Sequence, residues 1–172
     1  MKGSFIMKIT SAPRGILQID EARIIFRNFA GVGGKFNAEG NRNFCLIIPT
    51  EELAQELIDK GWNVKMRAPR DEGEEPLRYL KVNVKFGEHG PTIYLRSGKS
   101  NTVLDENTVS CLDRIDISSV DMDIRPYNYD VNGKIGISAY LKTMCVYQEV
   151  DRFAERFAEE SSNEVPDDNE PF

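Results

Sequence analysis

The sequence has few of the residues that build metal centres and nucleophilic active sites. Its 172 residues include one histidine, His89, and no serine or cysteine nucleophile stands beside it. The three cysteines are far apart and contain no CxxC pair, which is typical of reduced core residues rather than of disulfides or metal ligands. These cysteines are Cys45, Cys111 and Cys145. The sequence therefore predicts a protein that is not an enzyme and that needs no cofactor.

Long apolar runs are also missing. No stretch approaches the roughly 18–20 apolar residues that a membrane-spanning helix needs. The first ten residues, MKGSFIMKIT, are too short and too polar for a secretory signal. We therefore expect a cytoplasmic protein that does not contact membranes.

Negative charge is unevenly distributed along the chain. The formal net charge is −6, from 28 acidic and 22 basic residues. Residues 159–172 hold six of the acids and no lysine or arginine, which leaves 22 acids against 22 bases in residues 1–158. The body is thus neutral on average and can carry a basic face if its acids lie elsewhere.

Segments rich in β-branched and aromatic residues dominate the chain and predict strands. One helix is expected over residues 50–61, with Thr50 as its N-cap and Gly61 at its end. Leu53, Leu57 and Ile58 would share one face of it. The dipeptide Asn132-Gly133 predicts a tight hairpin between the last two strands. The predicted strands cover residues 22–29, 43–49, 62–68, 78–86, 91–98, 115–127 and 134–147.

Several short strands, one intervening helix and no βαβ rhythm predict a mainly β fold, a small closed or partly open barrel with an extra hairpin. We expect residues 1–150 to form this domain. Residues 151–172 would add a short helix and then a disordered acidic tail. The helical pattern itself runs from Gln148 to Glu160 and places Phe153 and Phe157 on one face.

Alternation along three of the predicted strands separates an apolar face from a basic, aromatic one. The inward residues would be Trp62, Val64, Met66, Leu80, Val82, Val84, Phe86, Ile93 and Leu95. No acid occurs among the outward positions. Single-stranded nucleic acid is bound by surfaces of this kind, because cations track phosphates and flat rings stack on unpaired bases. A plain solvated sheet face is the alternative. The outward candidates for binding are Lys65, Arg67, Tyr79, Lys81, Lys85, Tyr94 and Arg96.

Two further regions offer candidate binding residues. The glycine-rich segment 30–37 lacks the spacing of a nucleotide-binding P-loop, and is either a rim loop presenting Lys35 and Phe36 or an ordinary turn. Arg42 follows it, while Phe44 shares a face with apolar neighbours and is expected in the core. Tyrosines near the predicted hairpin either stack on bases or cap the sheet edge. These are Tyr127, Tyr129 and Tyr140.

Two other functions compete with nucleic-acid binding. Four carboxylates in residues 113–123 would bind Mg²⁺ in a metal-dependent nuclease, although their irregular spacing fits a solvated strand edge better. A protein-binding adaptor is the other alternative. The four carboxylates are Asp113, Asp116, Asp121 and Asp123.

The chain ends in VPDDNEPF, an acidic run followed by proline and a terminal phenylalanine. This end resembles the C-terminal tip of bacterial single-stranded DNA-binding proteins, where an acidic run precedes Pro-Phe. With the barrel pattern over residues 15–147 and the P-Y-N-Y segment before the hairpin, the chain resembles a single-stranded DNA-binding protein of a tailed bacteriophage. The tip residues that carry the match are Asp167, Asp168, Glu170, Pro171 and Phe172.

The resemblance implies an OB-fold, a five-stranded barrel that coats and protects unpaired DNA without sequence preference in phage replication, recombination and repair. It implies that the acidic tip recruits replication and recombination proteins and competes with DNA for the basic groove. A monomer or homodimer in the host cell cytoplasm is expected. A tethered tail has a high local concentration, so it can compete without high intrinsic affinity.

Overall fold

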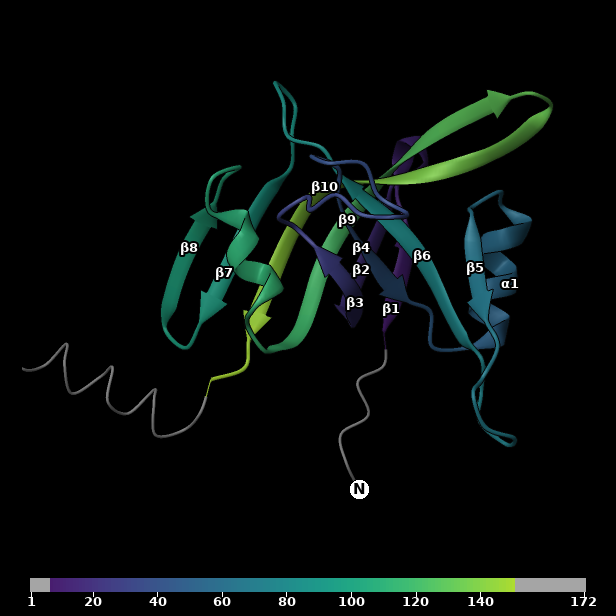
Figure 1. Ribbon diagram of the computed structural model, residues 1–172, viewed down its shortest axis with the longest axis horizontal. Coiled ribbons are helices and arrows are strands. Elements are labelled where there is room, and N and C mark those ends of the chain that lie inside the picture. The colour runs from purple at the N-terminus through teal and green to yellow at the C-terminus, as the bar shows by residue number, and fades with distance from the viewer. Residues whose placement is uncertain (1–6, 151–172) are drawn as a thin grey trace, which may run out of the picture.

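A computed structural model describes residues 7–150 of the chain (Figure 1). These residues form ten strands, one α-helix and two short 3-10 helices, which confirms the predicted mainly β fold with one intervening helix. The helices are η1 (Pro13–Gly15), α1 (Glu51–Asp59) and η2 (Val109–Asp113). The strands are β1 (Lys8–Ser11), β2 (Leu17–Ala22), β3 (Ile24–Asn28), β4 (Arg42–Ile47), β5 (Val64–Arg67), β6 (Leu77–Val84), β7 (Thr92–Ser97), β8 (Ser100–Leu104), β9 (Ile117–Val131) and β10 (Lys134–Gln148).

Five strands form the barrel. The first is a bent strand that consists of β2 and β3, and the other four are β4, β6, β10 and β9. β2 and β3 are separated by Arg23 alone; β2 pairs with β9 and β3 pairs with β4, both antiparallel. The ring continues through β4–β6 (antiparallel), β6–β10 (parallel) and β10–β9 (antiparallel). Only two residue pairs join β6 to β10, so the barrel is partly open there. This is an OB-like barrel.

The barrel interior is filled by the residues that alternation directs inward. On β6, Leu80, Val82 and Val84 are all at most 4% exposed, as predicted. Phe44 is fully buried and stacks on Phe29, with ring centroids 5.3 Å apart, which confirms its core role. All three cysteines are free, and Cys45 is buried.

The predicted inward position of Met66 is wrong, because 68% of this residue is exposed. Met66 is opposite Arg78, near the start of β6. Here β5 pairs with the edge of β6 that pairs with β10 further along the strand. Alternation still turns Met66 away from the face of Lys65, but β5 lies off the barrel ring and pairs with β6 alone, so Met66 does not point into the barrel.

Helix α1 begins and ends where its sequence indicates. The Thr50 hydroxyl accepts a hydrogen bond from the Leu53 N–H at 3.2 Å, and Gly61 has a positive φ of 100° just beyond the helix. Leu57 is buried, but Ile58 is 45% exposed and lies at the margin of the apolar face. No helix within residues 7–150 has the length and apolar character to cross a membrane.

Two hairpins extend the barrel. The β9–β10 hairpin projects from the body (Figure 1, green), and its turn has positive φ at Asn132 and Gly133, which confirms the predicted turn. The β7–β8 hairpin lies along the last part of β10. Gln148 ends β10, so the predicted helix does not begin there; the rest of that helix and the tail lie outside the described residues.

Candidate nucleic-acid interface

The outward side of β6 carries Tyr79, Lys81 and Asn83 at alternate positions, with Lys85 directly after the strand. Asn83 is opposite Asn43 on β4 and opposite Tyr140 on β10. Its side-chain amide donates a hydrogen bond to the Ala139 carbonyl at 3.2 Å, between β6 and β10, which share only two residue pairs. Three strands therefore present polar and aromatic side chains to one outer surface.

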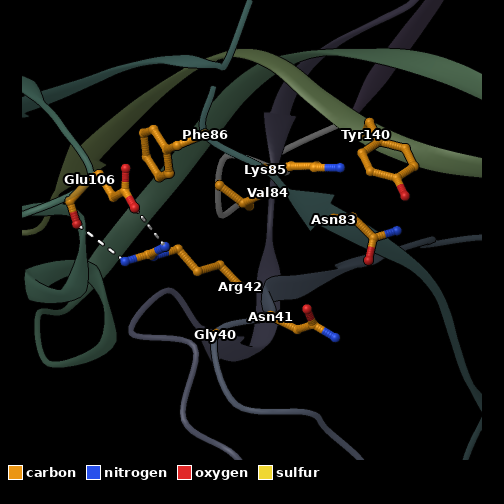
Figure 2. A pocket seen from close by; sticks show the side chains of 9 residues that line it. All are labelled: Gly40, Asn41, Arg42, Asn83, Val84, Lys85, Phe86, Glu106 and Tyr140. Carbon is orange, nitrogen blue, oxygen red and sulfur yellow. Dashed lines mark hydrogen bonds and ion pairs between the residues drawn. The ribbon is translucent and has the colours of Figure 1, made fainter. Parts of the chain in front are cut away.

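Two adjoining hollows lie on this surface, and together we call them the central groove. The first has a volume of ≈ 380 Å³ (Figure 2) and the second of ≈ 300 Å³. Lys85 and Tyr140 line both, so the hollows lie side by side. The first is also lined by Gly40, Asn41, Arg42, Asn83, Val84, Phe86 and Glu106, and the second by Arg125, Pro126 and Tyr127.

Aromatic rings and cations meet at the β9 side of the central groove. The rings of Tyr127 and Tyr140 are edge-to-face, with centroids 5.7 Å apart, and the Arg125 guanidinium lies 5.8 Å from the centre of the Tyr140 ring. Tyr127 is 60% exposed. A base that stacks on these rings would have Lys85 and Arg125 close to its phosphate.

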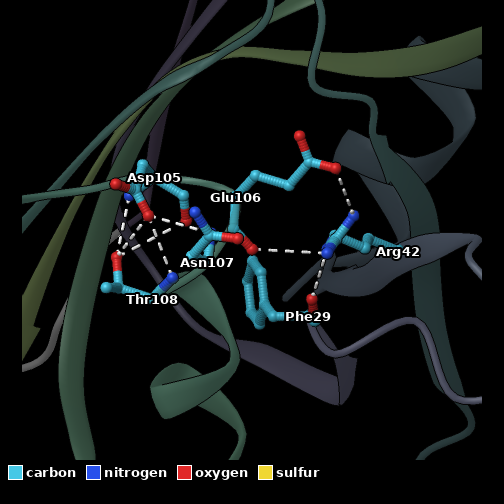
Figure 3. A network of polar contacts seen from close by, with 6 residues as sticks. All are labelled: Phe29, Arg42, Asp105, Glu106, Asn107 and Thr108. Carbon is cyan, nitrogen blue, oxygen red and sulfur yellow. Dashed lines mark hydrogen bonds and ion pairs between the residues drawn. The ribbon is translucent and has the colours of Figure 1, made fainter.

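At the other side of the groove, Arg42 connects β4 to the turn after β8 (Figure 3). Its Nε donates to the Phe29 carbonyl at 2.9 Å, and its Nη2 donates to the Glu106 carbonyl at 3.3 Å. Its Nη1 is 3.8 Å from the Glu106 carboxylate, and its guanidinium lies 5.5 Å from the centre of the Phe86 ring. These contacts within the protein fix the position of the Arg42 guanidinium. Glu106 places a negative charge in a groove whose other charged residues are cations.

The turn that carries Glu106 is held by its own hydrogen bonds (Figure 3). The Asp105 carboxylate accepts from the backbone N–H groups of Asn107 at 2.8 Å and Thr108 at 3.0 Å. Such a turn, in which an aspartate binds the backbone two residues on, fixes the chain direction locally. Glu106 is therefore presented to the groove by a well-defined loop.

Two segments flank the groove and carry further predicted residues. In the loop between β3 and β4, Phe36 is 91% exposed, with the Lys35 ammonium 5.4 Å from the centre of its ring. On the β9–β10 hairpin, Tyr129 packs across Gly136, where an added Cβ would lie 2.7 Å from the tyrosine Cζ. A ring that fills the space above a glycine gives the hairpin a flat aromatic surface.

The remaining predicted residues lie outside the central groove. Tyr94 is opposite Cys145 on β10, five residues beyond Tyr140, or about 17 Å along the strand, and Arg96 lies further on the same strand β7. Tyr79 and Lys81 lie on β6 before the groove. Lys65 is opposite Tyr79, and Arg67 follows it on β5. Of the predicted set, the groove itself contains Arg42, Lys85, Tyr127 and Tyr140.

The groove residues that the sequence does not identify as binding candidates include Arg125, Asn83 and Phe86. Arg125 precedes Tyr127 by two positions in a strand, so alternation alone places it on the same face. Alternation predicts Phe86 in the core, but it is partly exposed and lines the groove beside Arg42.

Two of the four carboxylates proposed for a nuclease bond to other groups of the protein. The Asp113 carboxylate accepts from the backbone N–H groups of Phe29 and Ala30, at 2.8 and 2.9 Å. Asp121 accepts from the Glu21 N–H at 2.9 Å and from the Tyr147 hydroxyl at 3.1 Å. In the described part of the chain, no group of three or more His, Cys, Asp or Glu residues is arranged to hold a metal ion. The nuclease alternative therefore has no candidate metal centre there.

Comparisons with known proteins give the fold and the family. The single-stranded DNA-binding protein of bacteriophage Enc34, solved in complex with ssDNA, aligns with 88% of this chain and 96% of its own, at a TM-score of 0.55 and 14% identity. A C-terminal truncation of that protein aligns with a TM-score of 0.51, 13% identity, and 88% and 98% coverage of this chain and its own. No curated protein matches the sequence. The family model described as "Putative phage ssDNA-binding domain" matches residues 8–170, and the chain therefore belongs to this family of phage single-stranded DNA-binding proteins.

Proposed function

We propose that this protein binds single-stranded DNA without sequence preference, in the central groove. The observation that carries the proposal is that Lys85 and Tyr140 line both hollows, which places aromatic rings beside cations on one outer surface. Family membership supports it, as does the similar fold of a phage protein solved with ssDNA.

The position of the groove on the barrel also supports the proposal. OB-folds bind oligonucleotides on the face of their second and third strands, between the loop after the first strand and the loop before the fifth. In this barrel those strands are β4 and β6. The flanking segments are the loop with Lys35 and Phe36 and the hairpin with Tyr127 and Tyr129.

Binding of this kind needs no base-specific contacts. Every base has a flat face that stacks on tyrosine, and every nucleotide has a phosphate that Lys85 and Arg125 attract. We therefore propose a non-enzymatic role, in which the protein coats and protects unpaired DNA in phage replication, recombination and repair, in the cytoplasm of the host cell.

Two parts of the chain have separate roles in this proposal. Residues 1–150 form the DNA-binding domain, and residues 151–172 carry the acidic tip that recruits replication and recombination proteins. The tip also competes with DNA for the groove, because its acids replace phosphates. The partner-binding residues would be Asp167, Asp168, Glu170, Pro171 and Phe172.

Incubation with fluorescent oligo-dT, with and without Mg²⁺ and beside a duplex of equal length, tests the proposal. We expect binding to the single strand without cleavage, weaker binding to the duplex, and little difference among single-stranded sequences. Mg²⁺-dependent cleavage would instead support a nuclease. Absence of binding to any DNA would leave the adaptor alternative.

Deletion of residues 159–172 tests the tail. Affinity for oligo-dT should rise, most at low salt, where charges are least screened. Deletion of Phe172 alone should leave DNA affinity unchanged but abolish capture of replication proteins, because it removes the apolar anchor and keeps all the acids. Weaker DNA binding by the tail-less protein would contradict competition.

A further inference from the structure

A second pair of aromatic rings lies on the outer surface, apart from the central groove. Phe26 on β3 and Tyr79 on β6 meet edge-to-face, with ring centroids 6.0 Å apart and planes at 85°. The two strands are not neighbours, because β4 lies between them. The ring pair therefore spans β4 on its outward side.

Phe26 is outward because the strand is irregular at this point. Ile24 is opposite Leu46, which is fully buried, so a regular strand would also direct Phe26 toward the core. The pairing shifts between Ile25 and Asn28, and Phe26 has a φ of +52°. As a result, 51% of Phe26 is exposed.

This conformation is unfavourable by itself. A bulky side chain at positive φ is a backbone outlier, and residues held in such conformations cluster at binding and active sites. Turning a phenylalanine from the core to solvent also loses apolar burial. The combination of strain and exposure at one aromatic residue indicates a ligand that contacts its ring.

A purely structural role explains only part of the geometry. Cys45 is an outward residue of β4 in this region, opposite both Ile25 and Lys81, and yet it is only 7% exposed. Its burial raises the pKa of the thiol to about 11, although the charge of Lys81 acts in the opposite direction. An aliphatic side chain at position 26 would supply the apolar bulk that covers Cys45, whereas Phe26 places an aromatic residue there that is 51% exposed.

The charges around the ring pair suit a polyanion. Lys65 is directly opposite Tyr79, and Lys81 is two residues further along β6 toward the groove; both are exposed. Of the ion pairs found in residues 7–150, none involves either lysine. The outward residues of β4 here are Asn43, Cys45 and Ile47, so no acid intervenes.

We infer that Phe26 and Tyr79 form a second base-stacking platform, which takes the same DNA strand after it leaves the central groove. The inference rests on the proposed function and adds a subsite to it. Asn83, which is opposite Tyr140, lies four residues from Tyr79, or about 13 Å along β6. Lys81 lies between them and neutralises the phosphates of the connecting nucleotides.

A length series of oligo-dT, from roughly 4 to 16 nucleotides, tests the inference with two variants of one residue. Phe26→Leu keeps an apolar side chain and must adopt the same positive φ, but it removes the ring. Phe26→Tyr keeps a ring. Phe26→Leu should weaken binding of the long oligonucleotides by roughly 5- to 150-fold and leave the shortest that bind unchanged. Phe26→Tyr should bind all lengths like the native protein.

Met66→Ala is the matched control, because it removes an exposed apolar side chain from β5 on the face opposite Lys65. It should not alter affinity at any length. Equal loss at all lengths in Phe26→Leu, or no loss at any length, would overturn the platform. Failure of the native protein to bind even the longest oligonucleotide would instead overturn the proposed function.

Photo-crosslinking provides a second readout that needs no variant of Phe26. Native protein is irradiated with bromodeoxyuridine oligonucleotides of the same lengths, and the crosslinked peptides are identified. Peptides containing Phe26 or Tyr79 should appear only with the longer oligonucleotides, while peptides containing Tyr140 appear with all. Absence of the Phe26 and Tyr79 peptides at every length would overturn the inference.

Discussion

The ring of Tyr127 packs against the ring of Tyr140 from the neighbouring strand, with an interplanar angle of 61°. Tyr140 is opposite Arg125, and Tyr127 is opposite Ser138, so the two tyrosines are diagonal neighbours on one face. Aromatic side chains reach each other at this spacing. Tyr140 is thereby held between Tyr127 and the Arg125 guanidinium, in the part of the groove that both hollows share.

This arrangement makes Tyr140 the first residue to test. Tyr140→Ala should weaken binding of oligo-dT by about 1–3 kcal/mol, because a stacking ring is lost. Tyr140→Phe should bind like the native protein, since stacking needs the ring and not the hydroxyl. Fluorescence anisotropy at one fixed salt concentration measures both. Equal losses in the two variants would show that the hydroxyl, and not stacking, carries the effect.

Lys85 should contribute through its charge. In Lys85→Ala, the slope of log affinity against log salt concentration should fall in magnitude by about 0.7, the value for one phosphate contact on a single strand. Lys60→Ala at the end of α1 is the control and should leave the slope unchanged. The measurement is a titration of oligo-dT at four or more salt concentrations. A native slope in Lys85→Ala would remove this residue from the DNA path.

Glu106 should oppose DNA binding. Its side chain is 63% exposed, and its carboxylate stands 3.8 Å from Arg42 in the groove. Glu106→Gln therefore removes a charge that repels phosphate and leaves Arg42 less neutralised. We expect affinity to rise roughly two- to fivefold at low salt, the scale of an exposed charge interaction, and the gain to vanish at high salt. Glu56→Gln on the exposed side of α1 should have no effect. Weaker binding by Glu106→Gln would mean that the carboxylate serves mainly to position Arg42.

The thiol of Cys45 should react only after unfolding. Burial raises its pKa to about 11, so below that pH the neutral thiol predominates, and the nucleophilic thiolate is scarce at pH 8. Iodoacetamide at pH 8 should therefore label Cys45 slowly in the native protein and rapidly in denaturant, as read by mass spectrometry of the Cys45 peptide. Rapid native labelling would show that the cover over Cys45 opens.

Features governed by local sequence were predictable. Alternation assigned the two faces of β6, Thr50 and Gly61 marked the ends of α1, and Asn132-Gly133 marked the hairpin. Each depends on a few consecutive residues whose backbone preferences agree with the fold.

Features set by distant parts of the chain were not predictable. The outward turn of Phe26 depends on a shift in pairing with β4, which no local pattern encodes. The exposure of Met66 depends on the position of β5, which lies off the barrel ring and pairs with β6 alone. The separation of Arg96 from the groove depends on the stretch of β10 that β7 joins.

Charge reversal at two outward positions locates the DNA most directly. Lys85 lies in the central groove, whereas Arg96 lies on β7, opposite Tyr147 and away from it. Lys85→Glu and Arg96→Glu change the net charge equally, so any long-range effect is shared. In titrations of a short oligo-dT, Lys85→Glu should abolish most binding and Arg96→Glu should retain nearly all of it. Equal losses, or a larger loss in Arg96→Glu, would contradict a binding site in the central groove.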